Sequence, residues 1–136
     1  MNIVIDSNIL FSALIRNSET RKIILNYDGF FLFPSYILIE MDKHKEELLE
    51  KSKLSKGDFD QLLHLLMRRV MVVPNDVIKP YVKDAIKIVK DIDIDDTIFI
   101  ACVLAYKESI LWSNDKKLKN QHRVKVLNTE EIRNML

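Results

Sequence analysis

The stretch that decides the fold is NIVIDSNIL, at positions 2–10. Residues 2–5 are largely apolar and β-branched, which predicts a short buried strand, and a helix is expected to follow through about Arg16. Asp6 stands between these two elements, where we expect Ser7 or Asn8 to cap the helix. An acidic side chain at the end of a buried strand is costly unless a partner or a ligand compensates it.

The same alternation of strand and helix continues through the chain. Further strands are expected at residues 30–33, 70–73, 110–112 and 124–127, each short and apolar. The segments between them are expected to be helical, with helices starting at Ser18, at Ser35 and at Ser55, a helix over 79–90, another over 97–108 and a last one capped by Thr129. Strands that alternate with helices predict an α/β fold around a mostly parallel sheet of about five strands.

Length and composition limit the possible classes of protein. The chain has 136 residues, which suits one domain over 1–136, and its 21 basic and 20 acidic residues leave a net charge of +1. The single cysteine, Cys102, excludes an internal disulfide and a cysteine zinc cluster. No apolar run is long enough to span a bilayer and no signal peptide is recognisable, so we expect no membrane association and a cytoplasmic location.

Four acidic residues occupy positions where chemistry is expected. Asp6 and Asp115 each end a strand, Asp96 precedes the apolar helix, and Glu40 lies in the apolar segment YILIEM. Each aspartate alone is more simply explained as a helix cap. As a set, however, these acids can converge at the carboxyl ends of the strands, where open parallel sheets bind ligands.

Converged carboxylates repel one another, and burial increases the cost. The sequence offers no cysteine or histidine set for a soft metal, so the acids point to a hard cation, Mg²⁺ or Mn²⁺. Ser7, Asn8, Ser113 and Asn114 would support the acids with neutral hydrogen bonds. Asp93 and Asp95 lie so close to Asp96 that either could also contribute.

These motifs resemble those of the PIN-domain family of metal-dependent ribonucleases, which includes the VapC-type toxins of toxin–antitoxin pairs. The resemblance is carried by VIDSNIL (4–10), by Glu40, by DIDDTIFIACVLA (93–105) and by LWSNDKKL (111–118). It covers nearly the whole chain. It implies a three-layer α/β/α sandwich, a Mg²⁺ or Mn²⁺ cofactor and hydrolysis of RNA phosphodiester bonds.

The resemblance also implies roles for individual residues. The catalytic set would be Asp6, Glu40, Asp96 and Asp115, with Asp6, Asp96 and Asp115 holding the metal and Glu40 joining it or orienting the attacking water. The partners that the resemblance implies are an RNA substrate and a possible antitoxin protein. We also expect a homodimer, and the helices over 35–69 could form either the dimer face or the antitoxin face.

A basic segment follows Asp115. Its side chains could guide RNA phosphates to the metal or could simply be solvated, and the sequence leaves both interpretations open. The residues concerned are Lys116, Lys117, Lys119 and Arg123.

Two other classes of protein fit parts of the pattern. A non-catalytic PIN-like module that binds RNA or protein would share the fold but would not need the complete acid set. A receiver domain or an aspartate-nucleophile phosphatase would share the alternation of strands and helices. The phosphatase pattern, however, needs a second aspartate where this chain has Asn8.

Overall fold

The computed structural model describes residues 1–136 and contains one five-stranded sheet. Its spatial order is β3-β2-β1-β4-β5, and every neighbouring pair is parallel, so the expectation of a mostly parallel sheet is confirmed. The strands are β1 (Asn2–Ile5), β2 (Phe31–Pro34), β3 (Val70–Val73), β4 (Ser109–Trp112) and β5 (Val126–Leu127).

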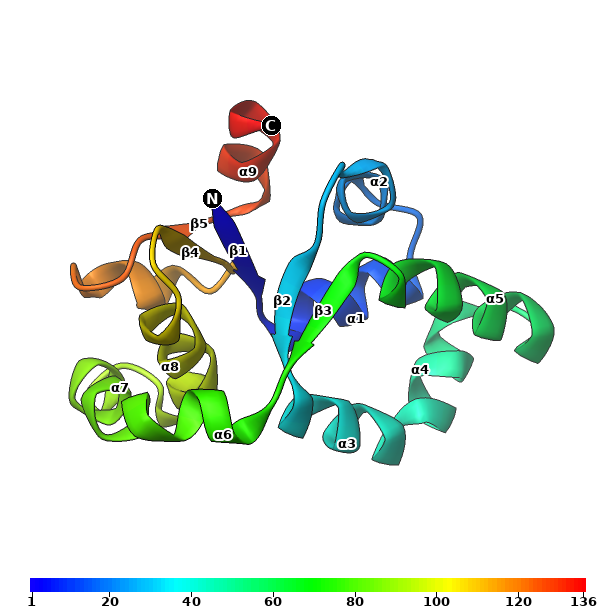
Figure 1. The fold of residues 1–136 in the computed structure, drawn as a ribbon. Helices are drawn as coiled ribbons and strands as arrows, with labels where there is room; N and C mark the ends of the chain where they lie inside the picture. The colour runs from blue at the N-terminus through cyan, green and yellow to red at the C-terminus, as the bar shows by residue number, and fades with distance from the viewer.

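Helices cover both faces of this sheet and complete a three-layer α/β/α sandwich (Figure 1). On one side lie α1 (Ser7–Ile15), α2 (Glu19–Asn26), α4 (Lys45–Ser52) and α5 (Lys56–Met67), and on the other lie α6 (Asn75–Ile78), α7 (Val82–Val89) and α8 (Thr97–Ala105). The remaining elements are α3 (Ser35–Lys43), α9 (Thr129–Met135) and the 3₁₀ turns η1 (Lys79–Tyr81), η2 (Ile94–Asp96) and η3 (Lys116–Asn120).

The core is built on the sheet and on α8. The residues of β2 are all buried, and α8 buries five consecutive residues, Phe99 to Val103. Aromatic rings pack between and within the layers. Phe33 of β2 packs against Phe99 of α8 at 6.2 Å between ring centroids, and Phe31 of β2 lies 5.6 Å from Trp112 of β4 within the sheet. None of the helices combines the length and apolar character that a bilayer crossing requires.

Several expected boundaries differ from the structure for local reasons. The helix expected from Ser35 onward breaks at His44, whose backbone leaves the helical region, so it forms α3 and α4 instead of one element. The segment 79–90 begins as η1, with Pro80 in the 3₁₀ turn, before α7 starts. The last strand is limited to Val126–Leu127. Asn128, not Thr129, caps α9.

The parallel register fixes what meets at the carboxyl edge of the sheet. Ile5 at the end of β1 pairs with Trp112 at the end of β4. The next residue of each strand therefore leaves the sheet beside the other, and the Asp6 N–H donates to the Trp112 carbonyl at 3.3 Å. The residue after Trp112 is Ser113, and Asp115 follows two residues later, close enough for its charge to act on Asp6.

Candidate metal centre

Asp6 is a buried carboxylate, with 4% of its surface exposed. It caps α1, because its Oδ1 accepts the Ile9 N–H at 2.9 Å, so the expectation that Ser7 or Asn8 would be the cap is wrong. The extended backbone at the end of β1 leaves Asp6 in the cap conformation, with φ −83° and ψ 170°, while Ser7 already begins the helix. Burial raises the pKa of Asp6, although the Ser113 side chain and the Ile9 N–H partly offset this effect.

Three further carboxylates converge beside Asp6. One oxygen of each of Asp93, Asp96 and Asp115 lies within 4.8 Å of the others, and all three side chains are half-buried. Short turns hold two of them, since Asp93 Oδ1 accepts the Asp95 N–H and Asp115 Oδ1 accepts the Lys117 N–H, both at 3.0 Å. The sequence predicted that Asp96 and Asp115 would meet and left the contribution of Asp93 open.

Among the three clustered acids, Asp96 is the one whose charged form is most disfavoured. Burial, followed by the charges of Asp93, Asp115, Asp6 and Asp95, raises its pKa from 3.8 to about 7. Its Oδ2 is buried and has no hydrogen-bond partner in the chain. A buried carboxylate oxygen that faces other carboxylates and lacks any donor needs a cation or a proton to be stable.

The donor set fits a hard divalent cation. The converging ligands are carboxylate oxygens only, without sulfur or imidazole, which is the set that Mg²⁺ and Mn²⁺ prefer. The Oδ2 atom of Asp96 accepts no hydrogen bond from the chain, so this oxygen is free to bind a cation. The cluster of Asp93, Asp96 and Asp115 can therefore bind such an ion, with Asp6 close enough to influence its charge.

Glu40 does not belong to this cluster and pairs with a lysine instead. It is on α3, which follows β2 and so begins at the same edge of the sheet. Its carboxylate pairs with the Lys43 ammonium at 3.3 Å, its side chain is 37% exposed, and it is not one of the three converging acids. Asp95 is exposed and is also outside the cluster.

The four expected supporting residues have different surroundings. The Ser113 hydroxyl accepts the Asp115 N–H at 3.1 Å and also interacts with Asp6, so it links two of the acids. Asn114 instead binds α9, because its Oδ1 accepts from the N–H and the hydroxyl of Thr129 at 2.9 and 3.1 Å. Ser7 is half-buried at the start of α1, whereas Asn8 is exposed.

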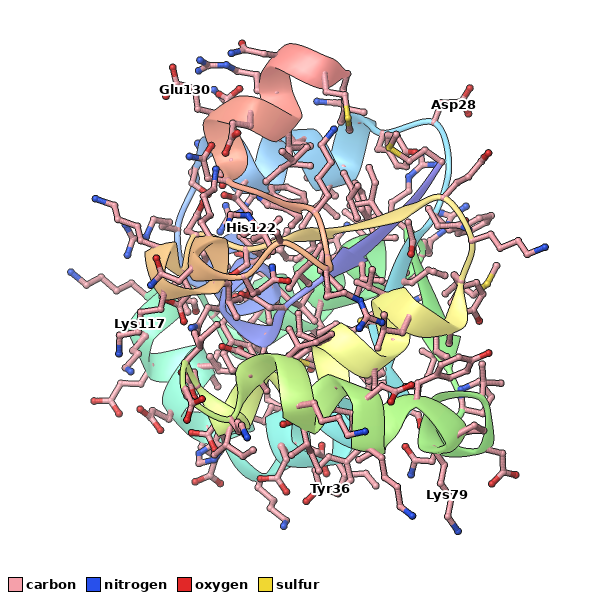
Figure 2. The ribbon with its side chains drawn as sticks, turned by 90° about the vertical axis from the view of Figure 1, so that its left-hand side faces the viewer. Asp28, Tyr36, Lys79, Lys117, His122 and Glu130 are labelled. Atoms are coloured by element: carbon pink, nitrogen blue, oxygen red, sulfur yellow. The ribbon has the colours of Figure 1, made fainter.

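A hollow of about 590 Å³ adjoins the cluster at Asp115, and we call it the acid-side hollow. It is lined by residues 113–116, Lys119 and residues 128–130, none of them hydrophobic. Figure 2 shows α9, which carries Glu130, above η3, which carries Lys117. Asn128 was not among the expected site residues, although the three-residue spacing from Asn128 to Glu131 is a capping-box signal that could have identified it.

The basic segment lies along this hollow and a second one. Lys119 also lines the second hollow, together with residues 121–126, and we call this one the basic hollow. Lys116 borders the acid-side hollow and Arg123 the basic hollow, whereas Lys117 lines neither. Lys119 pairs with Glu131 of α9, which anchors it between the two hollows.

Comparison with known proteins agrees with this architecture. The family model described as PIN domain matches residues 4–136, nearly the whole chain. No curated protein matches the sequence. PIN domains are generally metal-dependent nucleases, and the acidic cluster fits that chemistry. On the matched length, the parallel sheet order and the converging acids, the chain belongs to the PIN-domain family.

Proposed function

We propose that this protein is a metal-dependent ribonuclease that hydrolyses RNA phosphodiester bonds with Mg²⁺ or Mn²⁺. The observation that carries the proposal is the cluster of Asp93, Asp96 and Asp115 beside the buried Asp6, with one Asp96 oxygen left without a partner. Such a concentration of buried negative charge lowers the stability of the fold, and its presence at the carboxyl edge of a parallel sheet is explained by a cation ligand.

Each acid has a proposed part in holding the ion. Asp96 and Asp115 are direct ligands, and Asp93 offers a third carboxylate from the position that caps η2. Asp6, fixed by the Ile9 N–H, contributes its charge from the end of β1, either as a ligand or by orienting Ser113 and Asp115. When bound, a divalent cation supplies Lewis-acid activation of water and neutralises the charge that develops on the phosphate.

Glu40 is proposed as the residue that joins the ligand set or orients the attacking water. Its place on α3, at the carboxyl end of β2, supports this role, and its ion pair with Lys43 would have to open for it. Substitution of Glu40 by glutamine tests the role directly, because a base or a ligand would lose activity and a surface ion pair would not.

RNA is the proposed substrate, and the basic segment supports it. Lys116, Lys119 and Arg123 are exposed cations that line the acid-side hollow beside Asp115 or the basic hollow. Because phosphate contacts dominate the affinity of nucleic-acid binding, these side chains would hold the strand near the metal. Lys117 would contribute only at longer range, and charge reversal at each position separates the contributions.

The toxin role and the antitoxin partner are those that the resemblance to VapC-type toxins implies. We propose a toxin of a toxin–antitoxin pair, active in the cytoplasm, forming a homodimer and neutralised by an antitoxin protein. Growth arrest on induced expression, reversed by the product of a neighbouring gene, tests the toxin role. Sedimentation analysis of the purified chain tests the dimer.

The activity itself is tested with a cleavage assay on a labelled RNA of mixed sequence. Cleavage should require Mg²⁺ or Mn²⁺, stop with EDTA and disappear in Asp96→Asn. The matched control is Asp28→Asn, which removes an exposed aspartate that makes no ion pair. An Asp96→Asn protein that cleaves as fast as wild type refutes the proposal. RNA binding without cleavage would instead favour a non-catalytic module.

A further inference from the structure

We propose that the acid-side hollow binds a second phosphate group of the RNA strand, adjacent to the phosphodiester that is cut. The proposal rests on the ribonuclease function above and deepens it. It assigns substrate binding to Asn114 and Asn128, because their free side-chain groups in this hollow are hydrogen-bond donors. A phosphate offers only acceptors, so it is the part of an RNA chain that such a lining selects.

Asn114 lines the hollow and carries an amide donor whose orientation is fixed. Its Oδ1 is fully engaged, since it accepts from both the N–H and the hydroxyl of Thr129. The Thr129 hydroxyl is itself held by the Trp112 indole N–H at 3.1 Å, and Trp112 is completely buried. This chain of contacts fixes the orientation of the amide, so that only the Nδ2 group of Asn114 remains free for a ligand.

The side-chain amide of Asn128 is also held in a fixed orientation, but by a different set of hydrogen bonds. It forms a capping box with Glu131, in which the Asn128 Oδ1 accepts the Glu131 N–H at 2.9 Å and Glu131 Oε1 accepts the Asn128 N–H at 3.1 Å. The Nδ2 group of Asn128 has no partner in the chain. The two asparagines thus offer amide donors in the lining of one hollow.

Two lysines line the hollow, and one of them, Lys116, carries a positive charge that no acid of the chain pairs with. Lys116 makes no ion pair, and Lys119 is held at the hollow by Glu131. The acids of the lining are Asp115, which belongs to the metal centre, and Glu130, which is exposed on the first turn of α9. Since Lys119 also lines the basic hollow, the strand would continue from the cluster toward Arg123.

Isosteric substitutions test this arrangement without removing its scaffold. In Asn114→Asp the Oδ1 atom can still accept from Thr129. In Asn128→Asp it can still cap α9, because aspartate is as good a cap as asparagine. Each change replaces the free donor with a negatively charged oxygen. The matched control is Asn17→Asp, which makes the same change at an exposed residue between α1 and α2.

Binding is measured by NMR titration of metal-free protein with inorganic phosphate, uridine 5′-monophosphate and uridine, monitoring the side-chain amide signals of the two asparagines. Phosphate and the nucleotide should shift these signals, and uridine should not. Each substitution should weaken nucleotide binding about tenfold, the loss expected for a hydrogen bond to a charged group, whereas Asn17→Asp should stay within about twofold of wild type.

Three results would overturn the proposal: no shift at 20-fold excess over about 1 mM protein, equal shifts with uridine, or unchanged nucleotide affinity in the double Asp variant. Cleavage assays separate this failure from failure of the proposed function. If wild type cleaves RNA and the double variant does so with unchanged KM, the phosphate subsite is wrong and the ribonuclease stands. If wild type cleaves no RNA with either metal, the proposed function itself is wrong.

Discussion

Replacing Asp96 with asparagine should make the metal-free protein more stable at alkaline pH. The folded state holds the Asp96 proton up to about pH 7, whereas the unfolded chain releases it near its ordinary pKa of 3.8. The folded state therefore binds more protons between these values, and the stability of the fold falls as the pH rises through this range. Above pH 7 the penalty is complete, and below about pH 4 it is absent.

The size of this effect follows from the shift. The difference between 3.8 and about 7 corresponds to at most about 4 kcal/mol at pH 8. Solvent screening at a half-buried side chain reduces this to about 2 kcal/mol. With a urea m-value of about 2 kcal/mol/M for a domain of this size, Asp96→Asn should raise the unfolding midpoint by about 1 M at pH 8.

The assay is urea denaturation in EDTA at pH 4 and pH 8, followed by the fluorescence of Trp112, the single tryptophan. The control is Asp28→Asn, whose midpoint should match wild type at both values of pH. With Mn²⁺ in excess the order should reverse, because wild type gains binding energy that Asp96→Asn lacks. The reasoning would be refuted if the Asp96→Asn midpoint at pH 8 in EDTA were lower than that of wild type. It would also be refuted if the variant gained as much over wild type at pH 4 as at pH 8.

Three further outcomes are expected from other parts of the chain, all measured by urea unfolding. Asp6→Ala should be less stable than Asp6→Asn by about 1 kcal/mol, because only asparagine keeps the cap of α1; equal stability would exclude the cap. Arg21→Lys should lower the free energy of unfolding by about 2 kcal/mol. The guanidinium donates to the carbonyls of Ala13 and Leu14 at 2.7 and 3.3 Å and so joins α1 to α2. An unchanged midpoint would show that these hydrogen bonds do not stabilise the fold. Glu108→Gly should stabilise the fold by about 1 kcal/mol, because Glu108 has φ +51° and glycine relieves that strain. The control, Glu46→Gly within α4, should destabilise the fold by a similar amount.

The sheet and the acids at its edge could be predicted because they depend on local patterns. Apolar β-branched runs identify strands such as β1 and β3, and the strand ends identify Asp6 and Asp115. Asp96 could be predicted for a similar reason, since it directly precedes the most apolar helix of the chain.

What could not be predicted depends on contacts between distant residues. Asn114 looks like a neighbour of Asp115 in sequence, yet it binds Thr129, fifteen residues later, because β5 returns α9 beside the end of β4. Asp93 could not be separated from Asp95, because Asp93 caps the 3₁₀ turn η2 and Asp95 lies within it, and a turn this short has no periodicity that reveals which of the two joins Asp96. The break at His44 likewise had no proline or glycine to announce it.

The central claim is that the converging carboxylates bind a divalent cation through Asp96. Isothermal titration of the metal-free protein with Mn²⁺ at pH 7.5 measures this most directly. The account predicts saturable binding by wild type and by Asp28→Asn, with the heat lost in Asp96→Asn and in Asp115→Asn. Binding of equal affinity in Asp96→Asn, or no heat for wild type at millimolar Mn²⁺, would contradict it.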